Sequence, residues 1–171
     1  LAVVRRPVLA PPFLASSPEV LSSRVLVLPS IADPGNLGTL LRSALAFGFG
    51  SVYIGSQTCD PFNRKALRAS MGAALIVRLC AAVPEDLSVF TASGGVVYAA
   101  SMESGALVSD KIPSTAPCAL VLGNEHDGIP DEWRRMCTSA VIIPVDEDVD
   151  SLNVAIAGSI LMWQLSRPVP L

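Results

Sequence analysis

The sequence predicts an α/β domain with a mostly parallel sheet that is flanked by helices. Short apolar runs alternate with helical patterns along the chain, and turn residues separate them, which is typical of strand–helix–strand units. The apolar runs are short and, apart from Arg78, contain no charged residue, as expected for strands that are buried on both faces. A chain of 171 residues is long enough for one such domain with a substantial core.

Each predicted element follows from its local pattern. Residues 1–23 combine prolines and serines with little periodicity, so we expect a linker or an N-terminal arm there and one domain over 24–171. The six predicted strands are 25–28, 52–54, 75–79, 96–100, 119–122 and 140–143. The five predicted helices are 37–47, 62–69, 84–91, 131–137 and 151–165.

Composition and charge exclude several classes of protein. The longest apolar stretch, 154–163, is interrupted by Gly158 and Ser159 and is too short to span a bilayer, so we predict a soluble protein. A net charge of −3 argues against a chain that wraps nucleic acid by bulk charge. Four cysteines without a CxxC pair and a single histidine give no zinc motif, so we expect no metal. Scattered reduced thiols fit the cytoplasm or an organelle interior, such as a mitochondrion or plastid.

The loop and helix over residues 33–50 carry the first candidate site. Asp33, Pro34 and Gly35 form a predicted turn, and Asn36 is a candidate cap for the helix that follows. Arg42 points away from the apolar stripe of that helix, whose members are Leu37, Leu40, Leu41, Ala44 and Leu45. Spacing alone favours a solvent-facing Arg42 over a guanidinium that grips a phosphate.

The loop over residues 123–130 follows a buried strand directly. Gly123 lets another group approach the backbone closely, and Gly128 is expected in a turn. The spacing matches neither a Walker loop nor a dinucleotide fingerprint. An ordinary polar turn is the simpler interpretation. A dehydrogenase-like enzyme would need a Gly-rich loop after the first strand, where "PSIADPGNLG" stands instead.

The third loop is acidic and leads into the last helix. Asp150 and Ser151 are good helix-start residues, and the helix after them is apolar on nearly every face. A cap and a solubilising loop account for Ser151. They do not explain Asn153.

Taken together, these stretches resemble the SpoU branch of the SPOUT RNA methyltransferases, the TrmH-like family. The resemblance covers about residues 24–166. Its first motif corresponds to Asn36, Gly38, Arg42 and Gly48, and "KALRASMGA" over 65–73 is similar to its middle stretch. The second motif corresponds to Gly123, Glu125 and Gly128. The third corresponds to Ile143, Pro144, Ser151, Leu152 and Asn153.

The resemblance implies a fold, a reaction and partners. The C-terminal segment would thread through a loop to form a deep trefoil knot, and the protein would be a homodimer with a site completed across the interface. S-adenosylmethionine would donate a methyl group to a ribose 2′-hydroxyl of rRNA or tRNA. The alternative is a factor of the same fold that binds RNA or the ribosome without catalysis.

Residue roles carry over by position. The catalytic candidates are Arg42, Asn36, Glu125, Ser151 and Asn153. The predicted donor-binding residues are Leu122, Gly123, Ile143 and Leu152. RNA contacts are expected from Arg42 and from Arg64, Lys65 and Arg68, although a solvated helix face explains these last three equally well.

Two features depart from the family pattern. The family usually has a glycine directly after the glutamate of its second motif, whereas here His126 and Asp127 follow Glu125. The side chains of these two residues either narrow the cofactor loop or point outward. The acidic residues over 146–150 would repel RNA phosphates if they faced them.

Overall fold

Seven parallel strands form one sheet in the order β3-β2-β1-β6-β4-β7-β5. The computed structural model describes residues 7–10, 24–101, 106–112, 117–124, 127–149 and 151–167. The strands are β1 Arg24–Leu28, β2 Ser51–Ile54, β3 Arg78–Ala81, β4 Val96–Ala100, β5 Leu107–Val108, β6 Cys118–Val121 and β7 Ser139–Ile142. The predicted fold class, a mostly parallel sheet flanked by helices, is confirmed.

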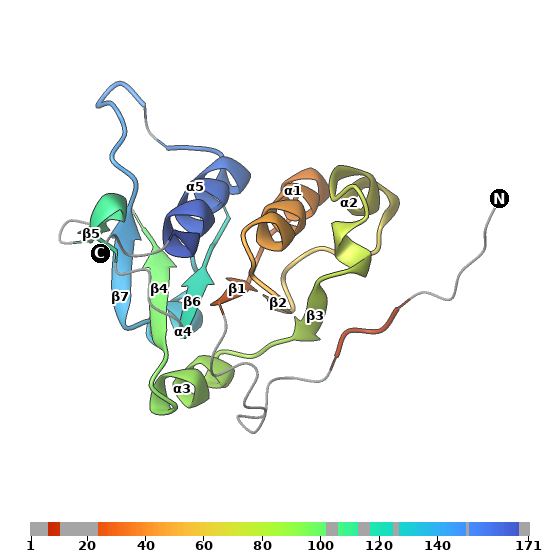
Figure 1. Ribbon diagram of the computed structural model, residues 1–171, viewed down its shortest axis with the longest axis horizontal. Helices are drawn as coiled ribbons and strands as arrows, with labels where there is room; N and C mark the ends of the chain where they lie inside the picture. Colours follow the sequence, from red (N-terminus) through yellow and green to blue (C-terminus); the bar gives the residue numbers. More distant parts are fainter. Residues whose placement is uncertain are drawn as a thin grey trace.

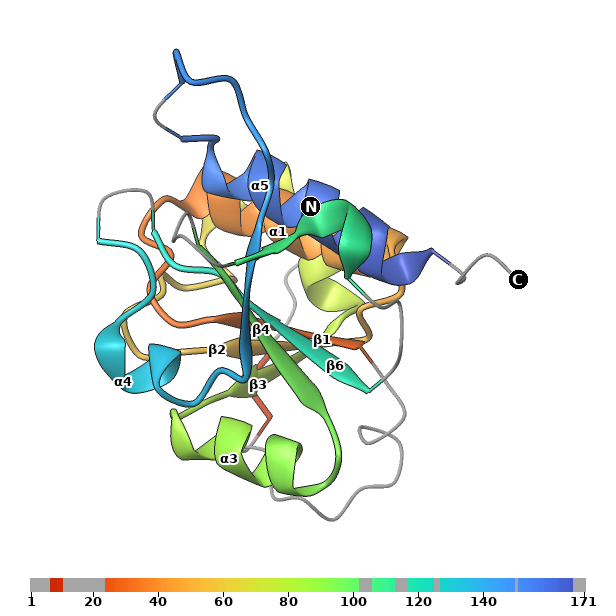
Figure 2. The ribbon, with the colours of Figure 1, turned by 90° about the vertical axis from the view of Figure 1, so that its left-hand side faces the viewer.

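Helices cover both faces of the sheet (Figure 1). The helices are α1 Pro34–Ala46, α2 Arg64–Ala69, α3 Glu85–Ala92, α4 Asp131–Arg134 and α5 Val154–Ser166, with 3-10 turns η1 Ala73–Leu75 and η2 Ser109–Lys111. Helices α1, α2 and α5 lie on one face, and α3 and α4 lie on the other, as the side view also shows (Figure 2).

Two apolar layers result from the alternation of side chains along the strands. Leu26 and Leu28 of β1 point toward α1 and α5, whereas Val25 and Val27 point toward α3 and α4. All four are buried, which is why residues 25–28 are apolar without interruption.

The third strand is misplaced in the prediction. Residues 75–79 were expected to form a buried strand, but Ala73–Leu75 is a 3-10 turn and β3 begins only at Arg78. Leu75 and Ile76 are 60% and 69% exposed, while Ala74 and Val77 are buried. That spacing of three residues between buried positions is the period of a helical turn and not of a strand.

Other boundaries also differ from the prediction. The two-residue strand β5 was not predicted, and α4 ends at Arg134 although a helix was expected through 137. Leu45 was assigned to the buried stripe of α1, yet it is exposed. Ala10, in the predicted arm, pairs with the edge strand β3 through hydrogen bonds on both sides of Cys80.

Two properties bear on the predicted environment. All four cysteines are free thiols. Among the helices in the described segments, none combines the length and the hydropathy that crossing a membrane requires.

Candidate functional site

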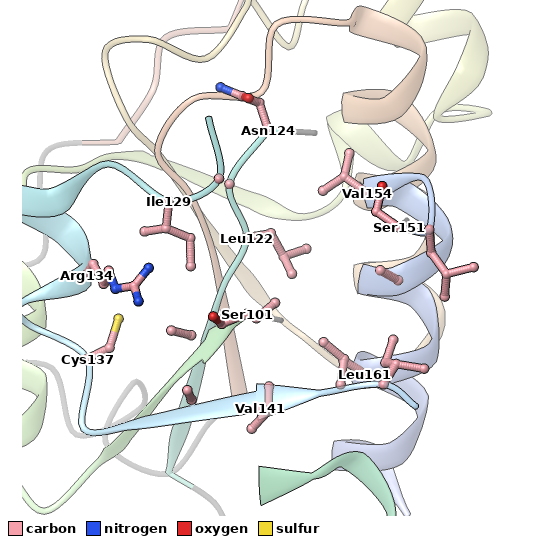
Figure 3. Close-up of a pocket in the computed structure, with 18 of the residues that line it drawn as sticks. Ser101, Leu122, Asn124, Ile129, Arg134, Cys137, Val141, Ser151, Val154 and Leu161 are labelled. Carbon is pink, nitrogen blue, oxygen red and sulfur yellow. The ribbon is translucent and has the colours of Figure 1, made fainter. Parts of the chain in front are cut away.

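A cavity of 590 Å³ opens at the carboxyl ends of β4, β6 and β7 (Figure 3). Ligands of parallel α/β sheets bind at this edge, where the loops leave the strands. Four stretches contribute the lining: the end of β4, the loop after β6, the segment from α4 through the end of β7, and the start of α5. The volume lies in the range of about 300 to 1,000 Å³ that is usual for small-molecule sites.

The loop after β6 folds back tightly on itself. Asn124 and Gly128 exchange backbone hydrogen bonds of 3.1 Å in both directions, and Gly128 has a positive φ of 68°. A Cβ atom at Gly123 would overlap the carbonyl group of Gly128. The close backbone approach predicted for Gly123 is therefore confirmed, and the group that approaches is the other end of its own loop.

Of His126 and Asp127, whose side chains were expected either to narrow the cofactor loop or to point outward, the structure describes Asp127. Asp127 is exposed and lines the cavity, its backbone N–H donates to Oδ1 of Asn124 at 2.7 Å, and its carboxylate accepts from Nδ2 of Asn124 at 3.3 Å. Glu125 and His126 lie outside the described residues, so the catalytic role expected of Glu125 stays a prediction.

The start of α5 differs from the expectation. We predicted a helix from Ser151, whereas the helix begins at Val154 and Asn153 is its N-cap. Oδ1 of Asn153 accepts from the N–H groups of Ala155 and Ile156 at 2.9 and 3.3 Å. Asn153 was the residue that a simple cap left unexplained, and it is itself the cap. Asp150 lies outside the described residues.

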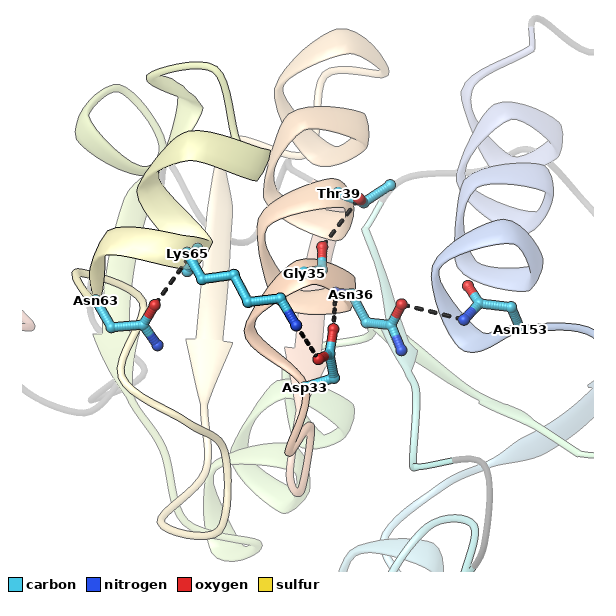
Figure 4. A network of polar contacts seen from close by, with 8 residues as sticks. Asp33, Gly35, Asn36, Thr39, Asn63, Lys65 and Asn153 are labelled. Carbon is cyan, nitrogen blue, oxygen red and sulfur yellow. Dashed lines mark hydrogen bonds and ion pairs between the residues drawn. The ribbon is translucent and has the colours of Figure 1, made fainter.

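A polar network joins the first motif to the third (Figure 4). Nδ2 of Asn153 donates to Oδ1 of Asn36 at 3.1 Å, across the space between α1 and α5. Asn36 was predicted to cap α1, but Asp33 does so by accepting from the backbone N–H of Asn36 at 2.9 Å. Asn36 is therefore free of the capping role and its amide is directed at α5.

The same network ties α2 to α1. Nζ of Lys65 donates to Asp33 at 2.6 Å, and this hydrogen bond is the main cause that lowers the pKa of the Asp33 carboxyl below its ordinary value. Both side chains are substantially exposed, so the pair contributes little to stability. Arg64 and Arg68 are exposed on the same short helix.

The structure brings some of the predicted site residues together and leaves others apart. All four predicted donor-binding residues line the cavity, together with Ser151. Of the catalytic candidates in the described segments, Asn36, Arg42 and Asn153 are not in that lining. Arg42 is exposed on α1.

Sequence reasoning missed several lining residues. Ser101 follows β4 directly and Arg134 ends α4, and both line the cavity. A polar residue at the end of a buried strand was a usable signal for Ser101. No pattern singled out Arg134. Cys137 also lines the cavity, and burial raises the pKa of its thiol to about 11 although the nearby Arg134 opposes the shift. The thiol therefore stays protonated at neutral pH.

The cavity offers mostly neutral polar groups and apolar walls. In the segments that the structure describes, no group of three or more His, Cys, Asp or Glu side chains could hold a metal ion. The tightly packed backbone at Gly123 and the apolar side chains of Leu122, Ile143 and Leu152 suit a flat, largely apolar ligand group.

Comparison with known proteins agrees with these features. The family model described as the SpoU rRNA Methylase family matches residues 23–163. The chain is 34% identical over 143 residues to the 23S rRNA (guanosine(2553)-2′-O)-methyltransferase RlmP of Bacillus subtilis, covering 83% of this chain and 57% of that protein.

Solved structures are similar over the same region. An AdoMet-bound rRNA methyltransferase from Sinorhizobium meliloti superposes with a TM-score of 0.76 at 33% identity, covering 84% of this chain and 55% of that one. The SpoU methyltransferase AviRb from Streptomyces viridochromogenes, in complex with AdoMet, gives a TM-score of 0.74 at 25% identity, covering 85% and 60%.

The chain thus spans somewhat more than half the length of these relatives. The family match, in contrast, includes every strand of the sheet and nearly all of α5. The chain belongs to the SpoU rRNA methylase family.

Proposed function

We propose that this protein transfers a methyl group from S-adenosylmethionine to a ribose 2′-hydroxyl of rRNA or tRNA. One observation carries the proposal: residues of the second and third family motifs, which are separated in the chain by residues 129–142, line one cavity at the ligand-binding edge of the sheet. RlmP, whose name describes 2′-O-methylation of 23S rRNA, supports the substrate class.

The donor site fits the residues that line the cavity. Gly123 and Gly128 let the two ends of the loop pack directly against each other, since a Cβ atom at Gly123 would overlap the Gly128 carbonyl, and this tight loop lines the cavity. Leu122, Ile143 and Leu152 supply an apolar wall for the adenine ring, and the neighbouring peptide groups supply donors and acceptors for its edge.

Catalysis then requires the protein to position a weak nucleophile. S-adenosylmethionine supplies a methyl group on a sulfonium leaving group. We assign Arg42 to a phosphate of the RNA, which would orient the 2′-hydroxyl, because the planar guanidinium presents several N–H donors that match phosphate oxygens. Asn36 and Asn153 hold the ends of α1 and α5 at a fixed separation. Ser151 lies in the cavity lining, where it can contact the ribose. Glu125 is the proposed carboxylate partner of Arg42.

The site is proposed to be completed by a second copy of the chain. Arg42 is absent from the described lining of its own cavity, yet it lies on α1, which packs beside α5. Helix α5 exposes Ile156, Ile160 and Trp163 even though its opposite face is buried. A homodimer that covers this face would bring Arg42 of one protomer toward the cavity of its partner.

Four finer assignments belong to the same proposal. The C-terminal segment forms the trefoil knot, and residues 24–171 form the catalytic domain after an arm over 1–23. The exposed Arg64 and Arg68 of α2, with Lys65, contribute to RNA binding. The compartment is one that keeps the four thiols reduced.

Calorimetry and mapping of 2′-O-methyl groups test the function. The chain should bind S-adenosylmethionine, and cells that lack the gene should lose a 2′-O-methyl mark from rRNA or tRNA. Arg42→Ala should abolish restoration of that mark while leaving donor binding nearly unchanged. A chain that binds RNA but not the donor would instead be the non-catalytic factor.

A further inference from the structure

The cavity carries a charged group at the end away from α5. Arg134 extends from the last turn of α4 into the space beside Cys137 and Ile129 (Figure 3). Among the lining residues, all of which lie in described segments, Arg134 is the one cation and Asp127 the one anion. The rest of the lining is apolar or neutral.

The backbone that carries Arg134 is firmly anchored. Its neighbour Trp133 is buried in the apolar layer between the sheet and helices α3 and α4, and the N–H of Arg134 donates to the carbonyl of Pro130 at 3.0 Å. The N–H of Cys137 donates to the carbonyl of Arg134 at 3.0 Å, which closes the turn. Arg134 itself is exposed, so a fixed backbone presents a solvent-accessible guanidinium at the cavity.

The two ends of the cavity therefore have different chemistry. The glycine loop, Ile143 and Leu152 provide closely packed backbone and apolar surface, which suit the face of an adenine ring. The α4 end provides a guanidinium, whose planar fork matches a carboxylate. S-adenosylmethionine has the same polarity, because adenine lies at one end of the molecule and the methionine carboxylate at the other.

We propose that Arg134 binds the α-carboxylate of the methionine part of the donor and so fixes the direction in which the donor lies. The assignment rests on the proposed function and extends it to a residue outside the three family motifs. Contact with the carboxylate places the adenine at the glycine loop and the sulfonium between the two ends. The negative Asp127 lies in the same lining and adds favourable potential for the cationic groups of the donor.

Two ligands that differ at the amino-acid tail test the contact. S-adenosylhomocysteine carries the carboxylate, whereas 5′-methylthioadenosine has the same nucleoside and a thioether but no amino-acid tail. We expect Arg134→Gln to weaken binding of S-adenosylhomocysteine about tenfold, the usual effect of losing one charge-assisted hydrogen bond, and to change binding of 5′-methylthioadenosine by less than twofold. Arg134→Lys should give an intermediate loss, because lysine keeps the charge without the fork.

Arg135→Gln is the matched control. Arg135 is the next residue, is also exposed and is not in the lining, so the variant makes the same change in net charge. It should bind both ligands like the wild-type chain. Equal losses in the two variants would reduce the effect to long-range charge and overturn the contact.

Three other results would overturn the proposed contact between Arg134 and the donor carboxylate. An unchanged affinity of Arg134→Gln for S-adenosylhomocysteine, with weaker RNA binding, would assign Arg134 to a phosphate and overturn the proposal. Equal weakening of both ligands would indicate damage to the cavity and would also overturn it. A wild-type chain that binds neither ligand nor S-adenosylmethionine would refute the proposed function itself, and the inference with it.

Discussion

Asn153 performs two tasks with one amide group. Its oxygen caps α5 by accepting from two backbone N–H groups, and its nitrogen donates to Asn36 on α1. Serine and threonine can cap a helix but cannot donate at that reach, and aspartate has no donor when ionised. The amide is therefore the side chain that satisfies both helices.

Substitutions at Asn153 should separate the two tasks. Asn153→Ala should lower the free energy of unfolding by about 1 kcal/mol, because the cap is lost. Asn153→Asp keeps an acceptor at the helix N-terminus, so its stability in urea should be near that of the wild-type chain. Both variants should transfer methyl groups more slowly if the link to Asn36 positions the site.

Each role of Asn153 has its own contradicting result. A wild-type rate in Asn153→Asp would remove the link to Asn36 from the mechanism. A wild-type unfolding midpoint in Asn153→Ala would remove the capping role. Both variants must be measured, since Asn153→Asp removes only the nitrogen donor whereas Asn153→Ala removes the donor and the capping oxygen.

Gly123 should tolerate no side chain. Gly123→Ala places a Cβ atom against the carbonyl of Gly128, so the loop must move, and overpacking of this kind costs about 1 to 3 kcal/mol. We expect a lower thermal midpoint and a loss of donor affinity of more than about tenfold by calorimetry. Gly50→Ala is the control, because a Cβ atom there meets nothing within 4 Å. Equal behaviour of the two variants would mean that the loop is not a cradle.

Sequence rules predicted the role of Gly123 better than that of Asn153. The rule for helix starts accepts Asp150, Ser151 and Asn153 alike, so it could not choose the true cap. The choice depends on Asn36, which lies more than a hundred residues away and is brought near only by packing. The need for glycine at 123 was visible from its place at a strand end, although the approaching group was not.

At the scale of elements, α2 is a short cationic helix. Arg64 and Arg68 are exposed, whereas Lys65 is paired with Asp33. If α2 contacts RNA, Arg64→Ala with Arg68→Ala should weaken RNA binding and lower the slope of log affinity against log salt by about 1.5, since two phosphate contacts are lost. Donor affinity should not change. Filter binding over a salt series measures the slope.

A control for α2 lies elsewhere on the surface. Lys111 of η2 is also exposed, and Lys111→Ala should leave the salt dependence unchanged. An unaltered slope in the Arg64 and Arg68 double variant would mean that α2 is a solvated face.

The misplaced boundaries share a physical cause. Residues 73–77 form a continuous apolar run that ends at Arg78, and such a run does not distinguish a strand from a helical turn. The buried positions Ala74 and Val77 have helical spacing, but burial is known only once the structure is. The strand β5 has two residues at the sheet edge, too few to leave a pattern.

At the scale of the molecule, the sheet class followed from the alternation of elements, whereas the cavity did not. Alternating strands and helices fix a parallel sheet, because parallel strands need crossover helices. The strand order, with β6 between β1 and β4, brings the loop after β6 beside the ends of β4 and β7. No local pattern contains that order. The prediction that these loops form one site therefore came from the resemblance to a family and not from any local pattern.

Helix α5 makes the oligomeric state a test of the whole arrangement. Ile156, Ile160 and Trp163 are 53%, 36% and 48% exposed, while the opposite face of the helix packs on α1 and the sheet. An apolar face of this kind indicates an interface, and a two-fold dimer would pair the same surface of both copies. Light scattering should give twice the chain mass. Ile160→Asp should shift the protein to monomer and, because Arg42 would then lack its partner's cavity, should also stop methyl transfer while each monomer still binds donor.

Leu75→Asp is the control for Ile160→Asp. Leu75 is at least as exposed as Ile160 but lies in η1, which is not part of the proposed interface. Its variant should remain dimeric and active, since the charge is added to a surface already in water. A wild-type chain that scatters as a monomer yet methylates RNA would place Arg42 in its own cavity, and the shared site would be wrong. Dissociation by both variants would mean that the interface extends over η1, on the far side of α1.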